Sequence, residues 1–193
     1  MNIYSLPTSL RLGGVDFAIR TDFRVIIGIM QQMQRDDFDD TEKWEICLRC
    51  LFIDYDTIPQ AEYMNAIQAA KEFLAAGTGG NENDHGRKPP VVDWEQDGPI
   101  IIPAVNAVAG KEVRAEKYVH WWTFLGWFTE IEHGTFSTVC AIRTKRNKGE
   151  KLEKWEQDFC KEHPELVYLR KKQTDEEKQR SEAEKQALFD LIG

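Results

Sequence analysis

The stretch Tyr118-Val-His-Trp-Trp-Thr-Phe-Leu-Gly-Trp-Phe-Thr-Glu-Ile131 decides the fold that we predict for this chain. It holds half of the six tryptophans, and these three lie within seven residues of one another. At about 100° per residue, its large apolar side chains cover roughly half of a helix surface, more than the stripe of an ordinary surface helix. They are Tyr118, Trp121, Trp122, Phe124, Leu125, Phe128 and Ile131, whereas Trp127 lies outside this arc. The pattern predicts a helix that is the central pillar of a packed domain, with or without a second, adhesive face.

The composition is that of an ordinary globular protein. The chain has 193 residues, of which 41% are hydrophobic and 30% charged. Its formal net charge of −8 argues against general nucleic-acid binding, because a duplex-binding protein neutralises phosphates with clustered Lys and Arg. No apolar run approaches the length of a membrane span, and the first residues lack the pattern of a secretory signal. Together with the four cysteines, these features predict reduced thiols and a cytoplasmic location.

Short-range patterns predict a mainly α fold, a multi-helix bundle with a short N-terminal β-hairpin. Apolar residues alternate on either side of Gly13-Gly14 between Leu10 and Ile19, which is typical of a hairpin with a two-residue turn. Helical spacing of apolar residues recurs along the rest of the chain. Besides the aromatic helix, we expect helices to begin near Thr21 or Asp22, Thr41, Pro59, Pro99, Thr135, Leu152 and the Thr174–Glu177 capping box.

Turn-forming residues divide the chain into subdomains. Residues 78–92 form the clearest linker, since they are rich in glycine, proline and asparagine and hold few apolar anchors. We therefore expect an N-terminal hairpin and three-helix subdomain over residues 1–77 and an aromatic-rich helical subdomain over residues 93–170. A charged C-terminal helix would occupy residues 171–193. The expected structural core includes Trp44, Trp94, Tyr118, Leu125 and Trp155.

Cys47-Leu-Arg-Cys50 has the spacing of a zinc-binding or redox pair. A zinc site needs two further ligands, usually as a second close pair, and Cys140 and Cys160 are isolated. A redox pair follows a strand, whereas this one lies inside a helical pattern. The favoured interpretation is packing in the core, where a free cysteine behaves as a small hydrophobic residue. We expect no metal site and no cofactor.

His120 borders the aromatic arc and is the histidine best placed for catalysis. A general base needs an orienting acid and a nucleophile. Glu116 and Glu130 are candidates for the acid, but no residue suggests itself as the nucleophile. The prediction is therefore that the chain is not an enzyme, and an enzyme using His120 with one of these glutamates is kept as a rival hypothesis.

Two charged stretches have simple interpretations. The basic residues from Arg143 to Lys154 alternate with Glu150 and Glu153, which indicates a solvated face or a patch for an acidic protein partner. Asp36-Asp-Phe-Asp-Asp40 lacks the glycine and closing glutamate of a calcium loop and is expected to cap a helix. The candidate partner-binding residues are instead aromatic, because such side chains anchor interfaces. They are Trp121, Trp122, Trp127 and Phe128.

Four blocks of sequence carry a resemblance to a known family: Val92-Asp-Trp-Glu-Gln-Asp97, His120-Trp-Trp-Thr-Phe-Leu125, Phe136-Ser-Thr-Val139 with Ile142-Arg-Thr-Lys145, and Lys151-Leu-Glu-Lys-Trp-Glu156. They resemble the bacteriophage "gene product fifteen" family of long-tailed phages and prophages of Gram-positive bacteria. The resemblance covers roughly residues 3–170, and the His-Trp-Trp block is its most specific part. No resemblance is found in residues 78–90 or 174–193.

The resemblance implies a role in tail assembly. The family is not known as enzymatic and is similar to the tail-assembly chaperones encoded between the major tail protein and the tape-measure protein. It implies a protein of the host cytoplasm whose partner is the tape-measure protein, with the major tail protein as a second candidate. The net charge and the short apolar runs predict no nucleic-acid partner and no membrane. It supplies no catalytic residue. Self-association stays open, and a structural tail or connector component retained in the virion is the alternative.

Overall fold

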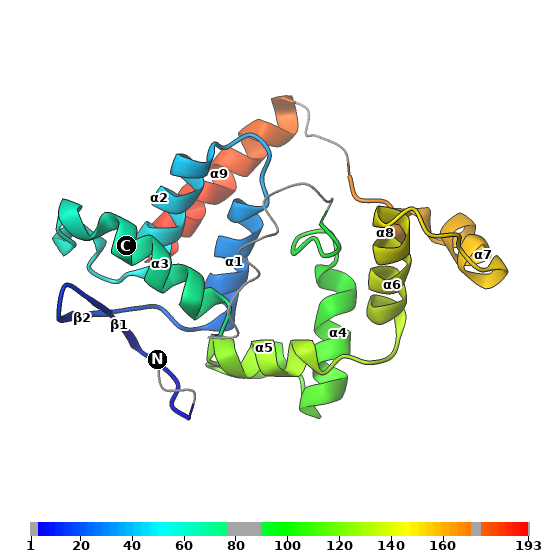
Figure 1. The fold of residues 1–193 in the computed structure, drawn as a ribbon, viewed down its shortest axis with the longest axis horizontal. Helices are drawn as coiled ribbons and strands as arrows, with labels where there is room; N and C mark the ends of the chain where they lie inside the picture. Colours follow the sequence, from blue (N-terminus) through cyan, green and yellow to red (C-terminus); the bar gives the residue numbers. More distant parts are fainter. Residues whose placement is uncertain (1–3, 77–89, 171–174, 193) are drawn as a thin grey trace. The chain divides into compact units, whose positions relative to one another are not determined.

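The computed structural model describes residues 4–76, 90–170 and 175–192. Its described part is mostly helical and includes one two-stranded sheet near the N-terminus, which confirms the expected mainly α fold with a hairpin (Figure 1). The chain forms two compact units. Unit 1 comprises Met1–Asn81, Tyr118–Thr123 and Lys172–Gly193, and unit 2 comprises Glu82–Lys117 and Phe124–Lys171. Most of the expected linker, residues 78–89, lies outside the described residues, as does Thr174 of the last capping box.

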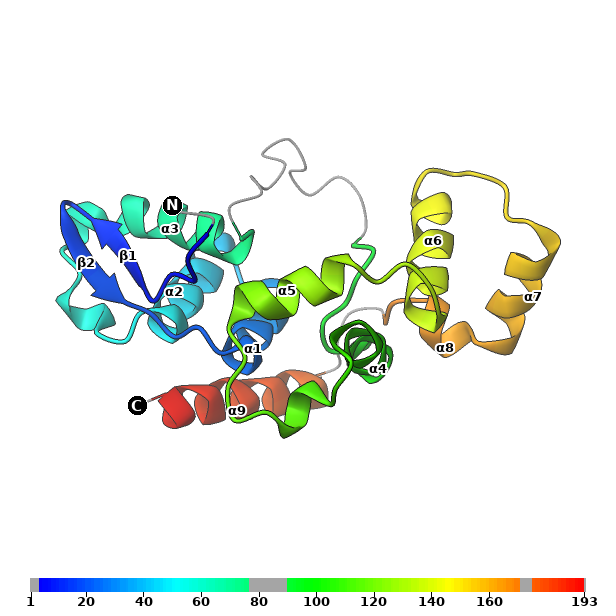
Figure 2. The ribbon, with the colours of Figure 1, turned by 90° about the horizontal axis from the view of Figure 1, so that it is seen from below.

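A β-hairpin opens unit 1. Strand β1 (Ser9–Leu12) pairs antiparallel with β2 (Val15–Ala18), and Leu12 lies opposite Val15 across a two-residue turn. Gly13 and Gly14 have φ angles of 53° and 89°, the left-handed region that this turn requires and that glycine adopts without steric cost. Leu10 and Leu12 are buried on one face of β1, which lies beside α3 (Figure 2).

Three helices complete the centre of unit 1: α1 (Phe23–Met33), α2 (Asp40–Leu51) and α3 (Tyr63–Leu74). The short turns η1 (Tyr55–Thr57) and η2 (Gln60–Glu62) connect the last two. Buried residues recur at helical spacing along α1 and α3, as expected from the sequence, whereas α2 is buried around most of its second half. The buried apolar residues of the three helices are Phe23, Ile26, Ile29, Ile46, Cys47, Leu48, Cys50, Leu51, Ala66, Ile67, Ala70 and Phe73. Helix α9 (Asp175–Ile192) also belongs to this unit.

Helix starts differ in detail from the expectation. Asp22 caps α1 as predicted, but Asp39 rather than Thr41 caps α2. The Asp39 carboxylate accepts the Glu42 N–H at 2.8 Å, and the Glu42 carboxylate accepts the Asp39 N–H at 3.0 Å. This reciprocal pair satisfies two backbone donors at once, which a threonine two residues later does not do.

Arg20 joins the end of the hairpin to the end of α2. Its backbone N–H donates to Leu51 O at 2.8 Å, and its Nη1 donates to Phe52 O at 2.8 Å and Cys50 O at 3.2 Å. Burial lowers the pKa of this guanidinium from its usual value. The last carbonyls of a helix have no partner within the helix, so a remote arginine supplies them here.

Unit 2 holds α4 (Gly98–Ala109), η3 (Val113–Ala115), most of α5 (Trp121–Thr129), α6 (Thr135–Asn147), α7 (Lys154–Glu162) and α8 (Pro164–Val167). Helix α4 ends as expected at Gly110, whose φ of 66° is left-handed. The aromatic helix α5 is shorter than predicted. Residues 118–120 precede it because their backbone pairs with residues 21–23.

A buried ion pair between Arg143 of α6 and Asp97, the residue before α4, organises unit 2. The guanidinium is 3% exposed and the carboxylate 1%, and two hydrogen bonds of 2.6 and 2.8 Å join them. The guanidinium also donates to the carbonyl oxygens of Val91, Leu166 and Val167, so all five of its N–H groups are used. Arg143 was expected on a solvated or partner-binding face, and this expectation is wrong because the side chain is fully enclosed.

Removal of one partner leaves the other charge buried and unpaired. We therefore expect Arg143→Met to lower the free energy of unfolding of unit 2 by about 3–5 kcal/mol. Arg143→Lys should recover little, because an ammonium group cannot donate along the same fork. Urea denaturation followed by circular dichroism measures both changes.

Arg146→Met is the matched control, since Arg146 lies one turn away on α6 and is exposed. Its change should stay within about 0.5 kcal/mol. Equal destabilisation by Arg143→Met and Arg146→Met would contradict the importance of the buried pair.

Candidate functional site

The His-Trp-Trp block (His120, Trp121 and Trp122) is the first candidate site. The segment before it runs beside the start of α1, where Phe23 N–H donates to Val119 O at 2.9 Å and Trp121 N–H donates to Thr21 O at 2.7 Å. The Tyr118 hydroxyl lies 2.6 Å from that of Thr21. This pairing brings the three aromatic side chains into unit 1.

His120 is held by the backbone on both sides of its ring. Its Nδ1 accepts the Trp122 N–H at 3.0 Å, and its Nε2 lies 3.0 Å from Pro7 O. Because Nδ1 is an acceptor, the proton lies on Nε2 and is donated to Pro7. The ring is 3% exposed and contacts Phe73 and Trp122 edge-on. Both nitrogens are thus engaged in holding the N-terminal segment and the first turn of α5.

The two indoles cap the end of α3. Trp121 Nε1 donates to Leu74 O at 3.0 Å, and Trp122 Nε1 donates to Phe73 O at 2.9 Å. The Trp122 ring also stacks on Phe73, with ring centres 6.2 Å apart. The last carbonyls of a helix need partners from elsewhere, and a buried indole needs an acceptor, so each group satisfies the other.

The second half of α5 packs inside unit 2. Phe124 is buried, and the Phe128 ring lies 5.0 Å from Trp94 and 5.3 Å from Phe136. Trp127 is half-buried, with Lys111 Nζ 5.5 Å from its ring centre. The helix therefore uses most of its aromatic surface within the fold.

The candidate partner-binding residues have little free surface. Trp121 is 1% exposed, and Trp122, Trp127 and Phe128 are half-buried. Among the expected core residues, Trp94 is buried, while Trp44 and Leu125 are half-buried. The other two expected core residues lie at the surface, since Tyr118 is 54% exposed and Trp155 57%.

Trp155 is exposed because the buried face of α7 is set by its neighbour. The Glu156 carboxylate accepts from Lys145 Nζ at 2.7 Å and from the Glu153 N–H at 2.7 Å, and these bonds hold it inside. The hydrogen bond from Lys145 lowers the pKa of Glu156. Cys160, one turn later, is also buried. The sequence signal for this orientation is the Glu153–Glu156 capping box, which fixes where α7 begins.

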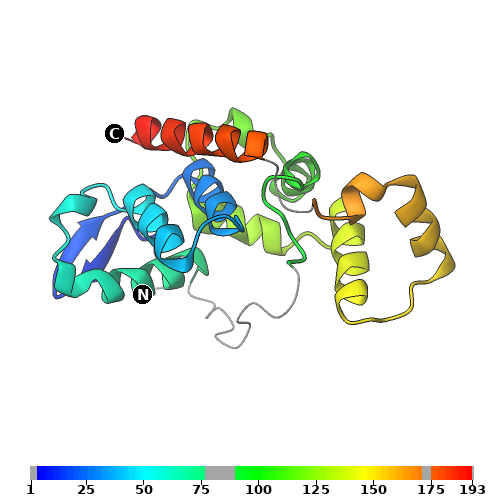
Figure 3. The ribbon, with the colours of Figure 1, turned by 90° about the horizontal axis from the view of Figure 1, so that it is seen from above.

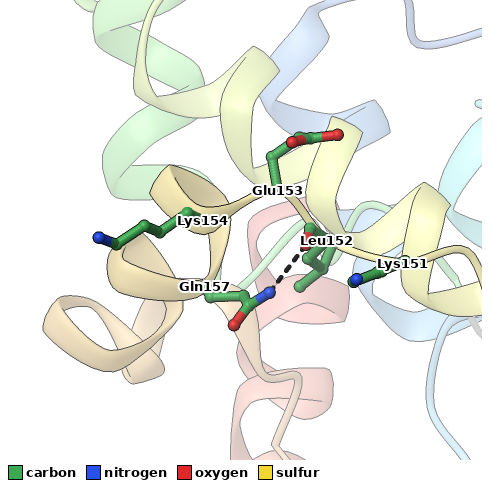
Figure 4. Close-up of a pocket in the computed structure, with 5 residues that line it drawn as sticks. All are labelled: Lys151, Leu152, Glu153, Lys154 and Gln157. Atoms are coloured by element: carbon green, nitrogen blue, oxygen red, sulfur yellow. Dashed lines mark hydrogen bonds between the residues drawn. The ribbon is translucent and has the colours of Figure 1, made fainter.

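Residues that flank Trp155 in the sequence line a pocket of about 300 Å³. It is lined by Lys151, Leu152, Glu153, Lys154 and Gln157 (Figure 4). Gln157 Nε2 donates to Leu152 O at 2.8 Å, which joins α7 to the segment before it. The Lys154 side chain points away from these two residues. The pocket residues together with Trp155 are called the α7 surface below. It comprises an exposed apolar ring and a mainly polar, partly basic pocket lining.

The cysteine pair has no open site. Cys47 and Cys50 are both fully buried, and burial raises their pKa values to about 12 and about 11. In the described parts of the chain, no three His, Cys, Asp or Glu side chains converge as metal ligands would. The burial confirms the interpretation of the pair as core residues.

The acidic loop before α2 is built around Phe38. Asp39 caps the helix, and Asp37 forms an ion pair with Arg35, whose guanidinium lies 4.1 Å from the Phe38 ring centre. The expectation that an aspartate of this loop caps a helix is confirmed.

Among the helices that the structure describes, none combines the length and apolar character needed to span a bilayer.

The His-Trp-Trp block should contribute to stability. We expect His120→Ala to lower the free energy of unfolding by about 1–3 kcal/mol, because two backbone groups lose their partner. Trp122→Phe removes one indole donor and should cost about 1 kcal/mol. Denaturant titration measures both. Trp155→Phe, at an exposed position, is the control and should change stability by less than about 0.5 kcal/mol. An unchanged stability of His120→Ala would contradict this role.

The cysteines should resist modification in the folded chain. Thiolate is the reactive form, and buried thiols of raised pKa hold little of it at pH 8. We expect iodoacetamide to label Cys47 and Cys50 only after unfolding, as measured by mass spectrometry of peptides from native and urea-treated protein. Rapid native labelling of either residue would show that α2 opens readily.

Comparison with known proteins identifies the family. A family model described as "Bacteriophage Gp15 protein" matches residues 3–169, a range that includes the His-Trp-Trp block, Arg143 and Trp155. Neither a curated protein nor a solved structure gives a match. The match extends over most of the 193 residues and confirms the resemblance carried by the four sequence blocks. The chain therefore belongs to the bacteriophage Gp15 protein family.

Proposed function

We propose that this phage protein is a non-enzymatic tail-assembly chaperone that binds the tape-measure protein in the host cytoplasm during tail morphogenesis. The observation that carries the proposal is the α7 surface. Within the family-matched residues, it contains Trp155, which is 57% exposed, and the residues that line a pocket of about 300 Å³. An exposed tryptophan is the type of side chain that contributes most to protein interfaces.

The chemistry of the α7 surface favours a helical partner. Trp155 offers an apolar ring, and Lys151 and Lys154 are among the residues that line the pocket. An amphipathic helix with an apolar side chain against Trp155 and an acidic one toward the lysines would suit both features. Tape-measure chains are expected to supply such helices. The major tail protein is proposed as a second, later partner that displaces the chaperone.

Action by binding alone is supported by the state of His120. Both of its ring nitrogens are bonded to backbone groups, so neither is directed at a substrate in this structure. Glu116, one of the two acids considered for it, forms an ion pair with Lys111 at 3.0 Å. The α7 surface is therefore the stronger basis for a function.

The proposal predicts that the tape-measure protein co-purifies with this chain on co-expression and gains solubility. Trp155→Gln should weaken co-purification about tenfold, equivalent to about 1.4 kcal/mol. The matched control is Met64→Gln, which removes an apolar side chain that is 71% exposed on α3 of unit 1. Co-purification that is absent from the wild type, or equally weakened by both variants, would contradict the proposal.

Composition of purified virions separates the chaperone from the alternative of a retained tail or connector component. A chaperone leaves before the tail is complete, so quantitative mass spectrometry should find no stoichiometric amount of the chain in mature particles. A fixed number of copies per particle would favour the structural alternative.

A further inference from the structure

Helix α9 contacts α1 and α2 within unit 1 (Figure 3). Two of its side chains reach the unit at defined points. Leu188 contacts Gly28 of α1, and Lys185 lies over the ring of Phe38, just before α2. Gly28 and Phe38 are called the α9 seat below.

Gly28 leaves room for a leucine. A methyl group placed on its Cα would lie 3.4 Å from Leu188 Cδ1 and 3.7 Å from Cδ2, so it would just touch the leucine. Any larger side chain would occupy the space that Leu188 fills. An alanine would therefore also fit at this position, in ordinary van der Waals contact with Leu188.

Phe38 accepts a cation from the docked helix. Lys185 Nζ lies 4.5 Å from its ring centre, within the range of a cation–π interaction. Arg35 contacts the same ring and is itself fixed by Asp37 and Gln32. Lys185 and Leu188 are three residues apart, so they project from one face of α9. The seat thus selects a simple pattern, a cation followed three residues later by leucine.

The seat and its occupant differ in their relation to the family. Gly28 and Phe38 lie within the matched residues 3–169, whereas α9 begins at Asp175, beyond the match. Several described side chains of α9 are exposed, among them Arg180, Glu184 and Gln186. The family part of the chain therefore holds a site for a helix that the family match does not supply.

We propose that the α9 seat is a docking site for an amphipathic helix of a partner protein that carries this cation–leucine pattern, and that α9 competes for it from within the same chain. A tethered helix acts at a high effective concentration, so the partner must supply additional contacts or bind while α9 is released. Assigning the helix to the tape-measure protein rests on the proposed function, whereas the seat and its competitor do not.

The experiment uses the full-length chain and a fluorescein-labelled synthetic peptide with the sequence of residues 175–192. Leu188→Glu in the protein should release α9 from the seat. Fluorescence anisotropy should then show the peptide binding to this variant at least about tenfold more tightly than to the wild type, whose seat is occupied. A peptide that itself carries Leu188→Glu is the control and should not bind.

Two further substitutions locate the binding. Gly28→Phe, added to the Leu188→Glu protein, fills the space for the leucine and should abolish peptide binding. Phe38→Leu in the same background removes the aromatic ring and should weaken binding about threefold to fivefold. Circular dichroism and thermal melting confirm that each variant is folded, and Phe38→Leu keeps the test decisive if Gly28→Phe unfolds.

Several results would overturn the proposal. They are equal peptide affinity for wild type and Leu188→Glu, equal binding of the control peptide, and binding that survives both Gly28→Phe and Phe38→Leu. Dimers of the wild type that form with rising concentration and vanish in Leu188→Glu would assign the seat to the α9 of a second copy. Because the assay contains no tape-measure protein, its failure is distinct from loss of the Trp155-dependent co-purification.

Discussion

The carbonyl groups at the ends of helices must find donors, and in this chain the donors come from side chains far away in the sequence. Arg20 supplies the end of α2, the indoles of Trp121 and Trp122 supply the end of α3, and Arg143 supplies α8. Each bond links two elements that lie far apart in the sequence. Short helices gain most of their stability from such tertiary contacts rather than from their own propensity.

This constraint explains why the richest aromatic block is a poor docking surface. A tryptophan whose N–H bonds a buried carbonyl cannot turn outward without leaving that carbonyl unpaired. The surface aromatic residue is instead Trp155, since Glu156 beside it is the residue held inside by Lys145. A block rich in aromatic residues therefore does not by itself indicate a binding surface in this chain, because its indoles also cap the end of a helix.

Local sequence patterns predicted the helices and the hairpin, but they did not predict which distant residues pair with one another. The hairpin around Gly13-Gly14 and the helices with apolar periodicity were predicted because their signals lie within a few residues. Three features depend on partners that spacing does not reveal. Residues 118–120 pair with residues 21–23 instead of continuing the aromatic helix. Arg143 forms a buried ion pair with Asp97. Glu156 is buried on α7, whereas Trp155 is exposed. In each case polar groups that bond inside the fold determine the arrangement, and the periodicity of apolar residues does not reveal such bonds.

Unit 1 is assembled from three separate stretches of the chain, and this order affects how the unit folds during translation. The first stretch, up to residue 81, emerges well before residues 118–123 bring the indoles that cap α3. Helix α9 follows residues 118–123 in the chain, so Gly28 and Phe38 stay uncovered on the nascent chain until α9 has also been synthesised. Domains generally fold in the order of their synthesis. A helix from another newly made phage protein would therefore meet the seat most easily during translation, before its resident competitor exists.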